Sequence, residues 1–201
     1  IHFSSPPYTG EMAFEKVLSL AKRLSLFNGG RVLKFYSVHF TQAQMAIHRH
    51  VQERYSLVCQ RRLMMRIADR IADKTHIKAM VTGENLGQVA SQTLENMAAI
   101  AEPTGKLVLR PLITYDKIET ISIARAIETF EISILPYEDC CTIFVPSSPV
   151  TKARMIDIQR VEAGLDFDEI VREALNRSQV YRIRNGDVLE VEKLELSEDA
   201  C

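Results

Sequence analysis

The sequence has almost no net charge and no long apolar run. Lysine and arginine number 25 and aspartate and glutamate 26, so the formal charge is −1 and no overall field attracts a polyanion. No apolar run reaches membrane-spanning length, and the first residues lack the charged and apolar regions of a signal peptide. We therefore expect no membrane contact, and any nucleic acid must be held by a local patch or by a part of the protein outside these residues.

Cysteine is also sparse. Cys59, Cys140, Cys141 and Cys201 are too few and too scattered for a secreted disulfide framework. No CxxC motif or second pair at metal-ligand spacing accompanies them, so no zinc site is expected. Cys59 suits a packed core, and Cys201 lies in an acidic tail. The default expectation is a cytoplasmic protein.

Cys140 and Cys141 stand next to each other after two carboxylates. Neighbouring acids raise the pKa of a thiol, so a nucleophilic or persulfide-bearing cysteine here needs compensating positive charge. Arg61 or a helix N-terminus could supply that charge. A pair of buried, inert thiols is the alternative that the residues leave open.

Predicted strands and helices alternate along most of the 201 residues, of which 46% are hydrophobic. The strands are expected at residues 1–3, 32–40, 77–81 and 106–110. The helices are expected around residues 14–21 with Thr9 as cap, at 42–50 and 53–75, from 88 onward, and at 116–127, 151–163 and 168–175. This alternation predicts an α/β fold, with a parallel sheet and helices on both faces.

The carboxyl-terminal segment differs from this pattern. Gln179 to Arg184 and Asp187 to Glu192 read as strands, and Asn185-Gly186 between them is a strong hairpin signal. Because a two-stranded hairpin is only marginally stable alone, it must dock on the main body or on another chain. We therefore divide the chain into a main domain, residues 1–178, and a hairpin with an acidic tail, residues 179–201.

The central stretch, residues 81–95, reads as the end of a buried strand, a turn and the start of a helix from Gln88. Gly83 and Gly87 supply positions where the backbone can bend or approach a ligand closely. A strand that leads into a helix N-terminus is how open α/β sheets bind anions and nucleotides. The alternative is an ordinary strand-to-helix turn.

Arginines on the predicted helix 53–75 fall on two faces. Arg61 projects from within the apolar arc, so it needs a carboxylate, a phosphate or an open cleft. An ion pair with Glu84 or a side chain that reaches past the sheet edge is the structural alternative. Arg62, Arg66 and Arg70 lie on the opposite arc, which is predicted to be a solvated face.

Several blocks of the sequence resemble one known family. They are residues 2–9, 61–67, 82–95, 110–112 and 132–144, and the collinear resemblance extends to about residue 175. Together they resemble the ThiI family of tRNA 4-thiouridine synthases, also called tRNA uracil sulfurtransferases.

The resemblance implies an ATP-pyrophosphatase fold of the PP-loop, adenine nucleotide alpha hydrolase-like type. In this family Mg-ATP adenylates a tRNA uridine, and sulfur arrives as a persulfide from a cysteine desulfurase. The same sulfur route supplies thiamine thiazole synthesis, with a thiamine sulfur-carrier protein as a further partner, and a homodimer is expected. The matching positions are His2, Phe3, Arg61, Gly83 and Gln92 for nucleotide contacts and Cys140 as the catalytic cysteine.

Other family features are expected outside these residues. The glycine-rich Ser-Gly-Gly-x-Asp-Ser loop and the RNA-binding THUMP domain should precede residue 1, and the chain opens without methionine, as an excerpt would. We therefore expect the 201 residues alone to be inactive. An amidating ATP-pyrophosphatase ligase and a non-enzymatic nucleotide-binding or docking module remain the alternative functions.

Overall fold

The structure is a computed structural model that describes residues 1–137, 140 and 143–194. Its elements fall into two units that interleave along the sequence. The first unit is Ile1–Thr41, Lys117–Cys140 and Arg172–Cys201, and the second is Gln42–Asp116 and Cys141–Val171. The division into a main domain and a separate tail at residue 178 stays a prediction.

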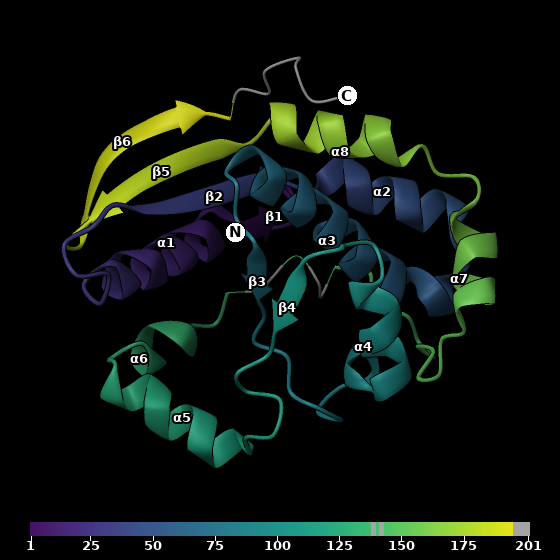
Figure 1. The fold of residues 1–201 in the computed structure, drawn as a ribbon, viewed down its shortest axis with the longest axis horizontal. Helices are drawn as coiled ribbons and strands as arrows, with labels where there is room; N and C mark the ends of the chain where they lie inside the picture. The colour runs from purple at the N-terminus through teal and green to yellow at the C-terminus, as the bar shows by residue number, and fades with distance from the viewer. Residues whose placement is uncertain (138–139, 141–142, 195–201) are drawn as a thin grey trace. The chain divides into compact units, whose positions relative to one another are not determined.

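A four-stranded sheet with the order β1-β2-β5-β6 forms the base of the first unit (Figure 1). Its strands are β1 (His2–Ser4), β2 (Leu33–His39), β5 (Gln179–Arg184) and β6 (Asp187–Lys193). β1 and β2 run parallel, which confirms the predicted parallel pairing, whereas β5 runs antiparallel to both of its neighbours.

The hairpin prediction is confirmed by β5 and β6. Asn185 and Gly186 between them have φ values of 51° and 88°, which is the left-handed geometry that a two-residue type I′ turn requires. β5 pairs with β2 from Leu33 to Ser37, so the hairpin docks on the sheet of the first unit.

Helix α1 (Glu11–Ser25) packs on this sheet through its apolar stripe. Leu18 and Ala21 form a buried cluster with Phe35 of β2 and Ile183 of β5. This cluster joins segments more than 140 residues apart, because a helix buries such a stripe only against another element.

The loop before α1 closes on itself. Thr9 Oγ1 accepts the backbone N–H of Ser5 at 2.9 Å, and the Thr9 N–H donates to the Ser5 carbonyl at 3.0 Å. The prediction that Thr9 caps α1 is therefore wrong, because its side chain is used within the loop. Gly10 takes the N-cap position and contributes no side-chain bond.

Two further helices belong to the first unit, α5 (Lys117–Ala126) and α6 (Phe130–Ser133). α5 confirms the helix predicted for residues 116–127. Arg23 of α1 reaches the segment between them: its Nε donates to the Ile127 carbonyl at 3.0 Å, and its guanidinium lies 2.6 Å from the Glu128 carboxylate.

The second unit contains most of the remaining helices and a parallel pair of short strands. Its elements are α2 (Thr41–His50), η1 (Glu53–Tyr55), α3 (Ser56–Lys74), β3 (Ala79–Val81), η2 (Ala90–Gln92), α4 (Leu94–Ala101), β4 (Leu107–Leu109) and α7 (Met155–Glu162). β3 and β4 pair in parallel, as predicted. α8 (Phe167–Asn176) begins in the second unit and ends in the first. No helix of the described residues is long and apolar enough to cross a membrane.

The predicted helix from Gln88 is wrong. Residues 86–89 form turns, η2 follows, and α4 begins only at Leu94. Gly87 has a φ of 78°, which a helix cannot accommodate, and Thr93 caps α4 by accepting the Asn96 N–H at 3.3 Å. Gly87 and Thr93 therefore determine where the helix begins, although the amphipathic pattern starts earlier.

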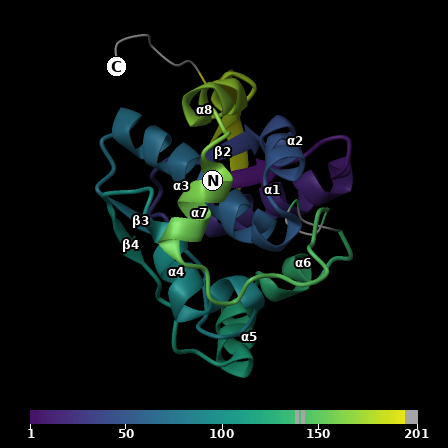
Figure 2. The ribbon, with the colours of Figure 1, turned by 90° about the vertical axis from the view of Figure 1, so that its right-hand side faces the viewer.

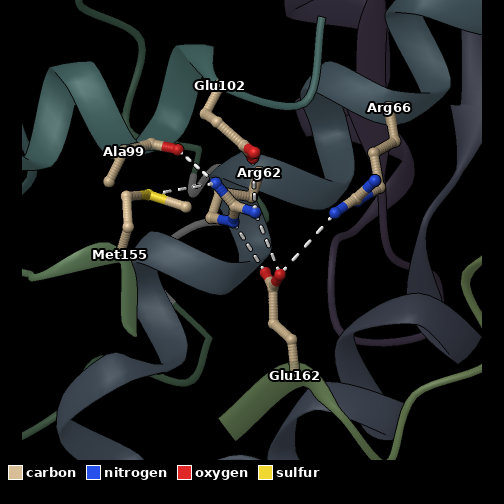
Figure 3. A network of polar contacts seen from close by, with 6 residues as sticks. All are labelled: Arg62, Arg66, Ala99, Glu102, Met155 and Glu162. Carbon is tan, nitrogen blue, oxygen red and sulfur yellow. Dashed lines mark hydrogen bonds and ion pairs between the residues drawn. The ribbon is translucent and has the colours of Figure 1, made fainter. Parts of the chain in front are cut away.

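Arg62 is buried, contrary to the prediction of a solvated face; its side chain is the centre of a polar network (Figure 3). Its Nε donates to Glu162 Oε1 at 2.8 Å, and one terminal nitrogen reaches Glu162 Oε2 at 3.1 Å and Glu102 Oε2 at 3.0 Å. The other terminal nitrogen donates to the Ala99 carbonyl and lies 3.9 Å from the Met155 sulfur. The prediction failed because α4 and α7 cover this side of α3 (Figure 2).

The other two arginines of this face differ in exposure. Arg66 lies 3.7 Å from the Glu162 carboxylate and stacks on the Phe167 ring at 4.1 Å, so it too is an internal contact. Arg70 pairs with Asp168 at 3.4 Å, and both of these side chains are exposed. The solvated face therefore begins only at Arg70.

Cys59 is buried on α3, as predicted, and its thiol should make stability depend on pH. Burial, and next the Glu162 carboxylate, raise the pKa of the Cys59 thiol to about 12. An unfolded thiol titrates near ~8.5, so above that pH the unfolded chain loses a proton that the folded chain keeps. The free energy of unfolding should therefore fall by up to ~1.4 kcal/mol per pH unit between these values.

Denaturant unfolding across that alkaline range tests this expectation. Cys59→Ala should remove this part of the pH dependence while other titrations remain. An identical alkaline slope in the variant and the parent would contradict the assignment.

Candidate functional site

Glu84 is the centre of a polar cluster where β3 and β4 end in the second unit. Its carboxylate is 5% exposed. Oε2 accepts the Thr82 hydroxyl at 3.0 Å and the Arg110 Nε at 2.8 Å, while Oε1 lies 3.7 Å from an Arg61 nitrogen. A buried carboxylate is stable only when cations and donors surround it, and here they come from α3 and from both strand ends.

Arg61 is held by Glu84 but keeps bonding capacity. The 3.7 Å contact is the ion pair anticipated as a structural alternative. The Arg61 Nε is buried and finds no hydrogen-bond partner among the described residues, although the side chain is 27% exposed. Because an unpaired buried donor costs ~1–3 kcal/mol, a polar ligand at this position is favoured.

The loop after Gly83 is fastened to the segment that follows β4. The Leu86 N–H donates to the Ile113 carbonyl at 3.1 Å, and the Asn85 amide donates to the carbonyls of Leu112 and Tyr115. A side-chain carbon built at Gly83 meets no atom within 4 Å, so the backbone there faces open space. The loop thus presents backbone to an approaching molecule.

Gln92 ends this loop and carries a second unsatisfied group. The residue is 8% exposed, and its Oε1 is buried with no hydrogen-bond partner in the described part of the chain. The neighbouring Ser91 Oγ is in the same state. Gln92 thus keeps an acceptor and Arg61 a donor for which the described residues provide no partner, and their role in nucleotide binding stays a prediction.

In the first unit, His2 and Phe3 are neighbours on β1 and face opposite sides of the sheet. The His2 ring stacks near Phe35 with ring centroids 6.3 Å apart, and Phe3 meets Phe40 edge-on at 5.2 Å. Both residues are half-buried, so they are fixed by aromatic packing.

Cys140 is buried, with 4% of its surface exposed. The segment that leads to it is anchored by Lys16 of α1, whose ammonium donates to the carbonyls of Leu135 at 3.3 Å and Tyr137 at 2.9 Å. Cys141 and Cys201 lie outside the described residues. The catalytic role of Cys140 stays a prediction.

The six predicted site residues therefore divide evenly between the units. His2, Phe3 and Cys140 belong to the first, and Arg61, Gly83 and Gln92 belong to the second.

Sequence reasoning did not place Thr82 and Arg110 on the Glu84 carboxylate. The signal was present, because Arg110 follows the strand that pairs with β3, and parallel strands end at the same edge.

Arg61→Ala is expected to weaken nucleotide binding by the whole protein by ~1–3 kcal/mol, the usual loss for a charge-assisted contact. Isothermal titration with ATP measures the change. Arg61→Lys keeps the charge without the planar guanidinium, so its affinity for ATP should lie between those of the parent and Arg61→Ala. A large fall in melting temperature with unchanged affinity would instead make Arg61 purely a structural partner of Glu84.

Comparisons with known proteins bear on the chain as a whole. A family model described as "Thiamine biosynthesis protein (ThiI)" matches residues 1–167. The "Probable tRNA sulfurtransferase" of Finegoldia magna is 47% identical over 184 residues, and that of Bacillus licheniformis is 48% identical over 179. These alignments include 92% and 89% of this chain, but 46% and 44% of the relatives. The chain thus spans about half the length of the curated relatives it matches.

One solved structure has the same fold. It is described as "Crystal structure of a 4-thiouridine synthetase - RNA complex with bound ATP" and superposes with a TM-score of 0.86 at 42% sequence identity. The superposition covers 90% of this chain and 47% of that chain.

Proposed function

This chain belongs to the ThiI family, and from that premise we propose that it is part of a tRNA sulfurtransferase that forms 4-thiouridine with ATP. The observation that carries the proposal is its 42% identity, over 90% of its length, to a 4-thiouridine synthetase with ATP and RNA bound. The buried, unsatisfied groups on Arg61 and Gln92 support it independently, because sequence comparison alone could not reveal them.

The nucleotide-binding residues in this proposal are His2, Phe3, Arg61, Gly83 and Gln92. ATP, accompanied by magnesium, supplies the adenylate group that turns a uridine oxygen into a leaving group. Arg61 donates to the bound nucleotide from a position set by Glu84, while the open backbone at Gly83 allows close approach. Gln92 accepts a hydrogen bond through the oxygen that is otherwise unsatisfied.

Cys140 is the sulfur-handling residue in this proposal. Sulfur reaches it as a persulfide made by a cysteine desulfurase. The outer sulfur attacks the activated uridine carbon as AMP leaves, which joins Cys140 to the base through a disulfide. A second thiol then attacks the Cys140 sulfur, so 4-thiouridine is released and Cys140 is left in a disulfide with that thiol. A thiol suits this role because its anion is a strong nucleophile and sulfur can be carried on it covalently. Supply of sulfur to the thiamine sulfur-carrier protein and assembly as a homodimer in the cytoplasm complete the proposal.

The nucleotide product tests the reaction type. The whole protein, supplied with ATP, a persulfide donor, a thiol reductant and unmodified tRNA, should release one AMP for each 4-thiouridine formed. A tRNA with cytidine at the modified position should stop sulfur incorporation. Release of ADP in place of AMP, or thiolation without ATP, would overturn the proposal.

A further inference from the structure

A cavity of about 200 Å³ lies in the first unit at the carboxyl ends of β1 and β2. Ser4, Ser37, His39 and Gln179 line it from the sheet, and Arg177 lines it from the turn after α8. The pairing brings these residues together: Ser4 is the partner of His39 in the register of β1 and β2, and Ser37 is the partner of Gln179. None of the residues assigned above to nucleotide and sulfur is among those that line it.

Side chains that can donate hydrogen bonds line part of the cavity, and the apolar Pro6 and Phe14 line the rest. The Tyr181 hydroxyl donates to Gln179 Oε1 at 3.0 Å, which leaves the Gln179 amide nitrogen as a donor. No hydrogen bond of the Ser37 hydroxyl is among those of the described residues, and the Ser4 hydroxyl makes only a long contact of 3.4 Å to the Val38 carbonyl. The polar part of this lining suits a ligand that offers hydrogen-bond acceptors.

His39 carries the clearest sign of a missing partner. Its Nδ1 is buried and has no hydrogen-bond partner among residues 1–137, 140 and 143–194. Burial, and next the charge of Arg177, lower the pKa of His39, while a backbone hydrogen bond and the Glu173 carboxylate act in the opposite direction. The net shift favours the neutral imidazole, which has one N–H. A neutral imidazole does not balance the positive charge of the Arg177 guanidinium, so an anion beside both groups is favoured.

Arg177 supplies the positive charge and can change partner. It pairs with Glu173 at 3.5 Å, and both side chains are substantially exposed. Exposed pairs of this kind contribute ~1 kcal/mol or less, so a multiply charged anion can compete for the guanidinium. Burial, and next the Glu15 carboxylate, raise the pKa of Tyr181, so Glu15 and Glu173 are the carboxylates that oppose such an anion.

We propose that this cavity binds a single phosphoryl group, held by the Arg177 guanidinium and by donors from His39, Ser37 and Gln179. Its volume is below the ~300 Å³ at which pockets for whole small molecules begin, so the rest of the ligand must extend into solvent. Planar guanidinium groups bind phosphate oxygens in a bidentate manner, and phosphate offers the acceptors that the lining needs. The phosphoryl group can come from a free nucleotide or from an RNA backbone.

Proton NMR of the 201-residue chain provides the test, because the chain has only five histidines to distinguish. Inorganic phosphate should shift the His39 resonances saturably and raise the pKa of His39 by ~1 unit, since an adjacent anion favours the charged imidazole. His39→Gln assigns the signal. Sodium chloride at equal ionic strength should leave it unmoved.

A matched pair of arginine variants tests whether phosphate binds in this cavity. Arg177→Gln should weaken phosphate binding at least ~10-fold, the effect of losing a charge-assisted contact. Arg184→Gln removes the same charge from an exposed position on β5 and should leave binding unchanged. Equal responses of both variants, or a shift that chloride reproduces, would overturn the proposal.

Three further ligands identify the source of the phosphoryl group: uridine 5′-monophosphate, uridine and a short uridine oligonucleotide. Tighter binding of the monophosphate than of the oligonucleotide indicates a nucleotide, the reverse order indicates an RNA backbone, and uridine alone should not bind. Binding of uridine as tight as that of its phosphate would overturn the phosphoryl assignment. None of these readouts depends on sulfur transfer, so their failure leaves the proposed function untouched.

Discussion

Replacement of Cys140 by serine is expected to reduce 4-thiouridine formation by the whole protein to background, while ATP binding stays near normal. A hydroxyl cannot carry a persulfide, so the change removes a covalent step without altering the nucleotide-binding residues. Mass spectrometry of nucleosides from tRNA incubated with the variant measures the product, and titration with ATP measures the binding.

Two other cysteine variants are the controls for this result. Cys59→Ala removes a buried thiol from the second unit and should leave thiolation per folded molecule unchanged. Cys141→Ser tests the adjacent thiol. If thiolation persists in Cys140→Ser and disappears in Cys141→Ser, the sulfur has been assigned to the wrong residue.

Burial of Cys140 also constrains how sulfur arrives. Only 4% of the residue is exposed, so a donor protein cannot reach its thiol in the structure described. The segment before it is held by two hydrogen bonds from Lys16 to backbone carbonyls. In the proposed function, delivery of sulfur to Cys140 therefore requires local opening.

Arg62→Met is expected to destabilise the chain by ~3–5 kcal/mol, because among the described residues it leaves the buried Glu162 carboxylate with the 3.7 Å contact to Arg66 as its one ion pair. For a protein of this size, the loss corresponds to a fall of ~6–20 °C in melting temperature. Arg70→Met removes the same charge from an exposed pair and should shift the melting temperature by little.

A double variant distinguishes the effect of an unpaired carboxylate from the effect of lost packing. Arg62→Met with Glu162→Leu replaces both charges by apolar groups of similar size, so most of the lost stability should return. Thermal unfolding followed by circular dichroism measures all four proteins. A double variant no more stable than Arg62→Met would show that packing, and not an unpaired carboxylate, causes the loss.

Local signals in the sequence predicted local structure well. The hairpin follows from Asn185-Gly186, since few other dipeptides adopt two successive left-handed conformations. Its docking strand was not predictable, because β2 lies about 145 residues earlier and pairing across that distance depends on the whole fold. The prediction of a helix from Gln88 was wrong because it rested on hydrophobic periodicity and did not include Thr93 as the N-cap.

The arginines of α3 show why the site was only partly predictable. A helical wheel recognises one buried face, but α4 and α7 add a second, and Glu162 lies 100 residues from Arg62 in the sequence. The Arg61–Glu84 contact was anticipated as an alternative, because Arg61 projects from the apolar arc of its helix and needs a carboxylate or another partner there. Unsatisfied groups such as Gln92 Oε1 appear only when the surrounding atoms are placed.

The outer position of β6 bears on how the protein avoids aggregation. β6 pairs only with β5 in the described sheet, so its other side offers backbone hydrogen bonds to any extended chain. Glu190 and Glu192 project from this strand, with Arg182 on β5 as their shared partner. A second copy aligned against β6 would bring like charges together, which opposes edge-to-edge growth into fibrils. The acidic strand therefore protects solubility where the sheet ends.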